Sequence, residues 1–352
     1  MRRQVVSTVA LAFMLVAPLF AAWTPAQAQD ATPAADCPAT SEEENRAVIQ
    51  RYYDIVAADE LDSLDEVLAP VVYQHAVDVM DGQGIEEVQA NLAVFTEAFA
   101  DLQFDIELWF SVDDYVAARV IQSGTHVGEF VGIPATGVES TWTIIAIWRI
   151  ECGKIAEQWI EVDSISRLRQ LGYIPQLVPS APATPGVLAS PAPTVSSPPA
   201  GCPDTTEEEN EAIIRRWYDE VWTQGNLDNL DELIAPNLAH HRVLNHVTTG
   251  ADAREATIRE WRSALPDQAN TPDFILANGD LVVARWIATG THEGEWEGIA
   301  PTGNEITWTG ITIFRIECGH IAEEWSEADG LAFFAQMGLL EWPPVQASPE
   351  VE

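Results

Sequence analysis

The sequence predicts an α+β fold that occurs in two copies, as tandem domains in one chain of 352 residues. Two observations predict it. First, residues 153–163 read GKIAEQWIEVD, and residues 319–329 repeat the pattern as GHIAEEWSEAD. Second, each copy begins with apolar residues at helical spacing and ends with segments of period-two alternation, an order typical of helices packed on an antiparallel sheet. Such self-similarity makes each copy a folding unit of its own.

Composition divides the chain into parts. Arg2 and Arg3 precede an apolar run from Val5 to Trp23, and Ala26-Gln27-Ala28 follows as a small-x-small cleavage site, which together predict a cleaved secretory signal peptide. We therefore expect the mature chain in the periplasm or outside the cell, with general secretion and twin-arginine export both left open. The predicted parts are the signal peptide (1–28), a disordered tail (29–36), the first domain (37–174), a linker rich in Pro, Ala and Ser (175–201), the second domain (202–342) and an acidic tail (343–352).

The formal net charge of −38 bears on the possible partners. Nucleic acids and anionic lipids are bound through cationic contacts, so this surface argues against both. No apolar run after the signal peptide is long enough to span a membrane, and we expect no membrane insertion once the peptide is cleaved. The charge argues against these two partners and identifies none.

Helices are predicted at the start of each copy. Capping boxes at Ser41 and Thr206 mark the first helix. A second, short helix is expected to end at Pro70 or Pro236. The predicted remainder is a short strand at 73–75 or 239–241, a third helix that carries apolar residues from 85 to 99, and strands at about 104–111, 115–127, 139–151 and 154–163, with counterparts at 273–277, 281–293, 305–317 and 320–329.

The predicted strand at 141–150 is apolar on both of its faces, which is unusual for a sheet that has one solvent-exposed face. We expect the second face to pack on another sheet, most simply that of the other copy. The two domains would then form a pseudo-dimer within one chain.

Four cysteines, Cys37, Cys152, Cys202 and Cys318, flank the two copies. One precedes the first helix of each copy and one lies in the turn before its last strand. Export favours disulfides, and of the three possible pairings the repeat favours Cys37 with Cys152 and Cys202 with Cys318. A metal site is the poorer interpretation, because no Cys-x-x-Cys or histidine cluster accompanies them.

The repeated last strand is the first candidate for a site. Side chains alternate along a strand, so Trp159, Glu161 and Asp163 share one face. An aromatic wall beside carboxylates is one way to build a pocket that contains an acid or base. The alternative is a solvated outer face, and period-two spacing alone does not decide between them.

An ordered series of motifs resembles a known family. The first copy has GTHVGE at 124–129, GIPATG at 132–137, then Trp142 and WRI at 148–150; the second has GTHEGE at 290–295, GIAPTG at 298–303, Trp308 and FRI at 314–316. Each copy resembles the SnoaL-like polyketide cyclases (ester cyclases) of the nuclear transport factor 2-like superfamily. The resemblance implies two cone-shaped α+β barrels, each enclosing an apolar cavity, and ring closure by intramolecular aldol condensation without a metal or cofactor.

The same resemblance assigns candidate catalytic residues. It places the acid/base carboxylate at Asp163 and Asp329, where burial in an apolar cavity would raise the pKa and improve the base. His126 and His292 are expected either to polarise the substrate carbonyl or to be strand-end histidines that bind their own loops.

Other side chains are predicted to line the cavity or, alternatively, to pack in the core. They are His75, His241, Trp142, Trp308, Trp159, Trp325, Tyr52 and Trp217. His240 and His246 have no counterpart in the first copy, which lowers the case for them. Arg119 and Arg285 are expected to make structural ion pairs. The predicted function is binding of a small apolar carbonyl compound in each cavity with acid/base chemistry; the alternative is a non-catalytic binding or interaction module.

Overall fold

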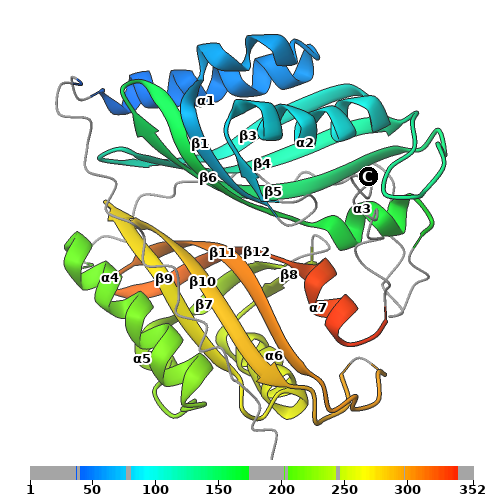
Figure 1. Cartoon of the computed structure of the whole chain (residues 1–352). Coiled ribbons are helices and arrows are strands. Elements are labelled where there is room, and N and C mark those ends of the chain that lie inside the picture. The colour runs from blue at the N-terminus through cyan, green and yellow to red at the C-terminus, as the bar shows by residue number, and fades with distance from the viewer. Residues whose placement is uncertain are drawn as a thin grey trace, which may run out of the picture. The chain divides into compact units, whose positions relative to one another are not determined.

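Figure 1 shows a computed structural model of the chain, which describes residues 37, 40–76, 81–173, 202, 205–242, 246–296 and 298–339. The predicted signal peptide, the tail before Cys37, the linker and the acidic tail lie outside the described residues.

The first repeat contains helices and a six-stranded sheet. Its strands lie in the order β2-β1-β6-β5-β4-β3. The elements are α1 (Glu42–Ala57), the 3₁₀ helix η1 (Leu61–Glu66), β1 (Leu68–Ala76), β2 (Gly82–Gln83), α2 (Ile85–Ala98), β3 (Phe99–Val112), β4 (Tyr115–His126), β5 (Glu139–Glu151), β6 (Lys154–Val162) and α3 (Ser164–Gln170).

The second repeat has the same topology, with the strand order β8-β7-β12-β11-β10-β9. Its elements are α4 (Glu207–Arg216), the π-helix η2 (Trp217–Thr223), α5 (Leu230–Leu233), β7 (Ile234–Arg242), β8 (His246–Thr249), α6 (Ala251–Ala264), β9 (Ala269–Asn278), β10 (Leu281–Thr291), β11 (Glu305–Glu317), β12 (His320–Ala328) and α7 (Gly330–Gln336). The predicted α+β fold, written twice, is confirmed.

Two details of the prediction were wrong. The sheets are mixed, because β1 pairs with β6 and β7 with β12 in parallel. Pro70 does not end the second helix but lies within β1, at a register shift between Leu68 and Tyr73. This placement fits proline, which cannot donate to the ladder and is confined to edges and irregular positions of strands.

The first helix of each repeat begins at the predicted capping box. The backbone N–H of Ser41 donates to Glu44 at 2.8 Å, and that of Thr206 donates to Glu209 at 2.9 Å. In both boxes the N-cap hydroxyl accepts in turn from the backbone of the glutamate. These reciprocal bonds satisfy donors that a helix start leaves unpaired.

The two repeats differ in length by one residue within their first helical region. Thr206 corresponds to Ser41 and Leu230 to Leu64, so the second repeat holds one extra residue between them. There the helix continues as the π-helix η2. A π-bulge accommodates a single insertion without ending the helix, and it is frequent at functional sites.

The sheets bury side chains on both faces. On β5, Trp142, Ile144 and Trp148 belong to the main core, whereas Ile145 and Ile147 belong to a second hydrophobic cluster. The apolar character predicted for both faces of this strand therefore corresponds to burial on both. Packing of one repeat on the other through these faces stays a prediction.

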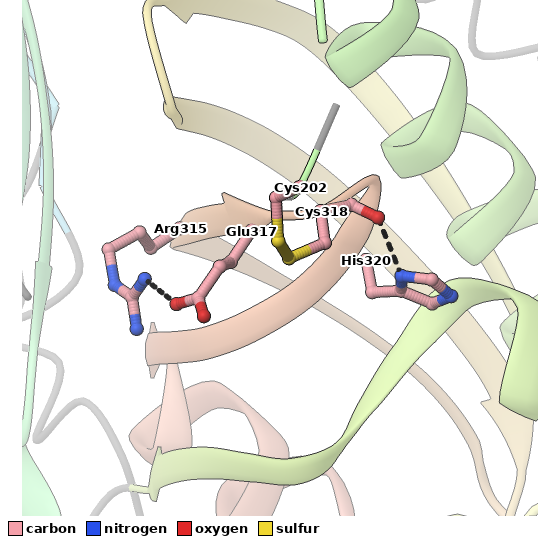
Figure 2. Close-up of a disulfide and its surroundings, with 5 residues drawn as sticks. All are labelled: Cys202, Arg315, Glu317, Cys318 and His320. Carbon is pink, nitrogen blue, oxygen red and sulfur yellow. Dashed lines mark hydrogen bonds and ion pairs between the residues drawn. A yellow bond between two sulfur atoms is a disulfide. The ribbon is translucent and has the colours of Figure 1, made fainter. Parts of the chain in front are cut away.

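Figure 2 shows the disulfide between Cys202 and Cys318, which confirms this predicted pairing. Cys318 lies in the turn between β11 and β12, where the carbonyl oxygen of Cys318 is 2.9 Å from Nδ1 of His320. Cys37 and Cys152 are also disulfide-bonded. Disulfides persist in oxidising compartments, which accords with the expected export. Within the described ranges, no helix has the length and apolar character needed to cross a membrane.

Candidate functional site

The first repeat contains a cavity of about 100 Å³ between its sheet and its helices. Its wall is mainly apolar, with a few polar side chains, a composition common in small-molecule sites. The cavity is lined by Tyr52, Tyr53, Val56, Gln74, Ala76, Asn91, Leu92, Phe95, Phe104, Gln122, Ile144, Trp148, Ile160, Val162 and Arg167. Of the predicted binding residues, Tyr52 is therefore a lining residue.

Two tyrosines of α1 form one side of this cavity. The Tyr53 ring lies 4.6 Å from that of Phe104 and 5.8 Å from that of Trp148, which fixes its position. Burial raises the pKa of Tyr52, whose hydroxyl lies beside Gln158, and it raises the pKa of Tyr53 well above the ordinary value. Both phenols therefore stay protonated and can donate hydrogen bonds.

Side-chain amides supply fixed polar groups in the same wall. Nδ2 of Asn91 donates to Oε1 of Gln74 at 2.8 Å, across α2 and β1. Nε1 of Trp142 donates to Oε1 of Gln122 at 3.2 Å, across β5 and β4. Each bond fixes the amide oxygen, so the amide N–H groups have a defined orientation. Trp142 thus acts behind the cavity wall, while its partner Gln122 lines it.

Arg167 brings a positive charge to the cavity. Its guanidinium carbon lies 4.7 Å from the ring centroid of Phe130, 5.1 Å from that of Trp142 and 5.5 Å from that of Phe95. Its side chain is almost fully buried. Stacking on aromatic faces is a favourable environment for a weakly hydrated guanidinium.

Asp163 and Asp329, the predicted acid/base residues, are helix N-caps. Oδ1 of Asp163 accepts from the backbone N–H of Ser166 at 2.9 Å, and Oδ1 of Asp329 from that of Ala332 at 2.8 Å. Asp163 is buried and follows Val162, which lines the cavity, but Asp163 is not itself a lining residue. Their catalytic role stays a prediction.

His126 and His292 bind their own loops, as in the second of the two interpretations. Nδ1 of His126 accepts from the backbone N–H of Thr136 at 3.2 Å, and the Thr136 hydroxyl is 3.0 Å away. His292 makes the same contacts with Thr302. An accepting Nδ1 carries no proton, and burial lowers the pKa of both histidines, so each is neutral at pH 7.

His75 and His241 each lie between a carboxylate and a tryptophan, and His75 is not a lining residue of the cavity in the first repeat. Nε2 of His75 is 3.1 Å from Oε1 of Glu157, and its ring stacks on Trp159 at 5.6 Å. Trp159 alternates along β6 with the lining residue Ile160 and so faces away from the cavity. His241, Glu323 and Trp325 repeat the arrangement at 3.0 and 5.3 Å.

Trp308 and Trp217 lie in the interior of the second repeat. The Trp308 ring packs 5.1 Å from Phe333 and 6.2 Å from Trp261. Trp217 is buried and lies under the guanidinium of Arg254, at 5.2 Å. The two predicted ion pairs are also present, between Arg119 and Glu107 and between Arg285 and Asp273.

The second repeat contains a buried charged cluster that lies outside the predicted site residues. Nη2 of Arg254, on α6, donates to Oε1 of Glu324, on β12, at 2.7 Å. Nε2 of His240, on β7, lies 3.9 Å from Oε2 of Glu324. His240 is not among the predicted site residues, because the first copy has no histidine at the aligned position. The informative signal is that three positions differ together between the copies. Gln74, Val88 and Gln158 of the first copy align with His240, Arg254 and Glu324 of the second.

No group of three or more His, Cys, Asp or Glu side chains placed to hold a metal ion occurs in the part of the chain that the structure describes.

Comparison with known proteins gives the following relationships. The sequence model of the SnoaL-like polyketide cyclase family matches residues 46–171 and 212–337. Among solved structures, TsrD from Streptomyces laurentii is 28% identical, with 39% of this chain and 100% of TsrD covered and a TM-score of 0.36. IdmH from Streptomyces antibioticus is 29% identical, with 37% and 98% covered and a TM-score of 0.33.

A third similar structure is a SnoaL-like polyketide cyclase from Agrobacterium tumefaciens strain C58. It is 22% identical, with 36% of this chain and 98% of that chain covered and a TM-score of 0.32. No curated protein matches the chain.

Proposed function

The chain belongs to the SnoaL-like polyketide cyclase family, and we propose that its first repeat binds a small, mainly apolar carbonyl compound in the cavity between sheet and helices. The single observation that carries the proposal is this cavity, with aromatic and aliphatic walls and a few polar side chains at fixed positions. For scale, an apolar cavity of roughly 150 Å³ binds benzene in an engineered protein, so a ring-sized ligand is the appropriate class.

Arg167 supports a carbonyl group on the ligand. A guanidinium is always charged and presents five donors, so an oxygen atom of the ligand gains a charge-assisted hydrogen bond there. The apolar lining residues, among them Phe95 and Ile160, offer contact to the rest of the ligand. Neutral tyrosine hydroxyls of α1 add hydrogen-bond donors without charge.

Acid/base catalysis by Asp163 is the second candidate function. The observation that favours it is its place in the chain, directly after the lining residue Val162 and four residues before Arg167. Proton removal next to a carbonyl needs a base within reach and a donor for the developing negative oxygen. In this scheme Asp163 supplies the base and Arg167 the donor. Asp329 would be the counterpart in the second repeat.

Cyclopentanone and cyclopentane form a probe pair that tests binding. We expect the ketone to bind the mature protein more tightly than the hydrocarbon, as measured by NMR titration of the cavity methyl groups. Arg167→Met should remove most of this preference, about tenfold in Kd, because the lost hydrogen bond is to a charged group.

Arg169→Met is the matched control, because Arg169 lies on the same helix but is not a lining residue. Its affinity for cyclopentanone should equal that of the wild type. Equal affinities for ketone and hydrocarbon, or equal losses in the two variants, would refute the role of Arg167. Exchange of the ketone's α-protons with solvent, lost in Asp163→Asn, would support the catalytic candidate.

A further inference from the structure

We propose that His126 and His292 are acid-sensitive latches, each of which holds the loop that follows its strand closed while the imidazole is neutral and releases it on protonation. The first loop is residues 127–138, between β4 and β5. The second lies between β10 and β11 and is described for residues 293–296 and 298–304. The inference does not rest on the function proposed for the cavity, because it uses other residues and its test needs no ligand.

Backbone hydrogen bonds fix the two ends of the first loop. At its start, the N–H of Gly128 donates to the carbonyl oxygen of Ala98 at 3.0 Å. At its end, the N–H of Gly137 donates to the carbonyl oxygen of His126 at 2.9 Å. The segment that protonation can release is therefore the tip between these two points, residues 129–136.

The imidazole of His126 binds this tip through its Nδ1 atom. Nδ1 accepts from the backbone N–H of Thr136 at 3.2 Å and lies 3.0 Å from the Thr136 hydroxyl. In the second repeat, Nδ1 of His292 makes the same contacts with Thr302, at 3.2 and 3.1 Å. A ring nitrogen can accept from an N–H only while it carries no proton. The contact with the backbone therefore requires the neutral histidine in the closed loop.

Protonation of Nδ1 turns this acceptor into a donor. Two N–H groups, one from the imidazolium of His126 and one from the backbone of Thr136, would then face each other, and only the threonine hydroxyl could accept. The Thr136 N–H would lose its acceptor, and a positive charge would stay in a buried ring, which is unfavourable on both counts. Release of the tip lets water solvate both groups.

Burial disfavours the charged ring in both repeats. His126 and His292 are each 0% exposed, and within the described residues Nε2 of His126 has no hydrogen-bond partner. The His126 ring packs on Phe99, with the centroids 5.2 Å apart. Burial lowers the pKa of both histidines, and at His292 the backbone of Gly294 opposes the shift without cancelling it. The charged form is therefore favoured only when the ring reaches water.

The charged side chains on the surrounding elements do not compensate an imidazolium. Around His126 the carboxylates are exposed; they are Glu97 of α2, Asp101 of β3, Glu129 of the loop and Glu139 of β5. Those around His292 are exposed as well; they are Asp267, Glu293, Glu295 and Glu305. Among the described residues, no carboxylate contributes to the pKa of either ring. Arg167, which stacks on Phe130 of the loop, is a cation and would oppose a second positive charge.

The loop tip carries an aromatic side chain that closes one end of the interior. Phe130 is 1% exposed and forms a two-way backbone bridge with Ile133, at 3.0 and 2.8 Å. Its ring centroid lies 6.0 Å from that of Phe95 and 4.7 Å from the guanidinium carbon of Arg167, and both of these residues line the cavity. Trp296 holds the corresponding position in the second repeat. Release of the tip would therefore withdraw Phe130 and admit water beside Arg167.

The direction of the pH effect follows from the lowered pKa of the closed state. An exposed imidazole titrates near pH 6.5, so below that pH the open loop binds a proton that the closed loop does not. Closure of each loop is thus strongest above about pH 7.5 and weakens as pH falls through this range. A single proton changes the opening equilibrium by at most about tenfold per pH unit.

Hydrogen exchange of the Thr136 and Thr302 amides on the full chain tests the inference, because the latches hold these N–H groups. We expect their protection, corrected for the intrinsic exchange rate at each pH, to fall about tenfold between pH 7 and pH 5. The amide of Ile145, in β5, should keep its protection, which distinguishes release of the loop from acid unfolding.

His126→Asn is the matched variant, because Oδ1 of asparagine is attached at the same point along the side chain as Nδ1 and accepts without titrating. Thr136 should then keep its protection at pH 5, while Thr302 in the other repeat still loses it. His292→Asn should reverse this pattern. His75→Asn removes a histidine that bonds to Glu157 and belongs to neither latch, and it should leave both profiles as in the wild type.

Unchanged or higher protection of Thr136 and Thr302 at pH 5 would overturn the inference, as would a loss that persists in the matching Asn variants. Simultaneous loss at Ile145 would assign the change to global unfolding and would overturn it as well. If neither Asn variant folds, the nitrogen-15 spectrum of the wild-type imidazoles decides. Unprotonated Nδ1 at pH 7 together with loss of protection at pH 5 supports the latches, whereas a protonated Nδ1 at pH 7 contradicts them.

Discussion

The guanidinium of Arg254 and the carboxylate of Glu324 lie 2.7 Å apart in the interior of the second repeat, with 3% and 2% of each residue exposed. The first repeat has Val88 and Gln158 at these positions and no charge on either. Two copies with one topology therefore enclose different chemistry. The first presents an apolar cavity with an aromatic-stacked arginine, and the second presents an ion pair.

Removal of one partner of this pair should strongly destabilise the second repeat. Arg254→Met leaves a buried carboxylate without its cation, which costs about 3–5 kcal/mol in comparable buried pairs. The double variant Arg254→Met/Glu324→Gln should recover much of that loss. Chemical denaturation gives the free energies of unfolding. As a control, Arg215→Ala in the exposed pair with Glu211 should change stability by no more than about 1 kcal/mol.

Substitutions of Asp163 and Asp329, the helix N-caps that follow the last strand of each repeat, distinguish a structural role from a catalytic one. Asn and Asp are equally good N-caps, so Asp163→Asn should leave stability nearly unchanged, whereas Asp163→Ala should cost about 1 kcal/mol. The same contrast is expected at α7, with little change in Asp329→Asn and a loss of about 1 kcal/mol in Asp329→Ala. Thermal unfolding measures both effects. A large loss in Asp163→Asn would show that the negative charge, rather than the cap, holds this region.

The disulfide between Cys202 and Cys318 should contribute strongly to the stability of the second repeat. It closes a loop with a sequence separation of 116 residues. In the chain-entropy model, a loop of this size stabilises the fold by about 4–5 kcal/mol. The double variant Cys202→Ala/Cys318→Ala should lower the free energy of unfolding by an amount of that order. A change below about 1 kcal/mol would contradict the entropic account.

Glu327 should make stability depend on pH in the neutral range. Burial raises its pKa to about 8, well above the value of an unfolded glutamate. At a pH between the unfolded-state and folded-state pKa values, the unfolded chain has lost the proton that the folded chain keeps. The contribution of Glu327 to stability is therefore greatest at low pH and falls as pH rises toward the folded-state pKa. The loss is roughly 2–3 kcal/mol between pH 6 and pH 8. Glu327→Gln should flatten this part of the profile, measured by denaturation at several pH values.

Apolar side chains on the face of each sheet that points away from the helices predict contact between the repeats. Ile145, Ile147 and Trp159 are buried there, as are the corresponding residues Ile311, Ile313 and Trp325. We propose that the two faces cover each other. Cleavage at a protease site inserted in the linker, residues 175–201, should leave halves that co-elute in gel filtration. Separate elution of folded halves would contradict the proposal.

The sequence predicted local and repeated features better than it predicted which face of a strand points to the helices and which strands pair. The capping boxes at Ser41 and Thr206 and the pairing of Cys202 with Cys318 follow from neighbours in sequence or from the repeat itself. The parallel pairing of β1 with β6 did not, because it joins strands that are about 80 residues apart.

The candidate site was predicted in part, and for physical reasons. Period-two spacing predicted one shared face for Trp159 and Asp163, but it did not show which face points to the helices, and β6 ends at Val162, before Asp163. Helix α3 was not expected, so the capping role of Asp163 was missed. His240 became significant only with Arg254 and Glu324, whose positions far apart in sequence gave no local signal.

The most direct test of the central claim is an isotope-filtered NOE measurement on the protein with carbon-13-labelled cyclopentanone. The account predicts NOEs from the ligand to Tyr52, Phe95 and Ile160, which line the cavity of the first repeat from three different elements. NOEs to Trp159, on the opposite face of β6, or no NOEs at saturating ligand, would contradict it.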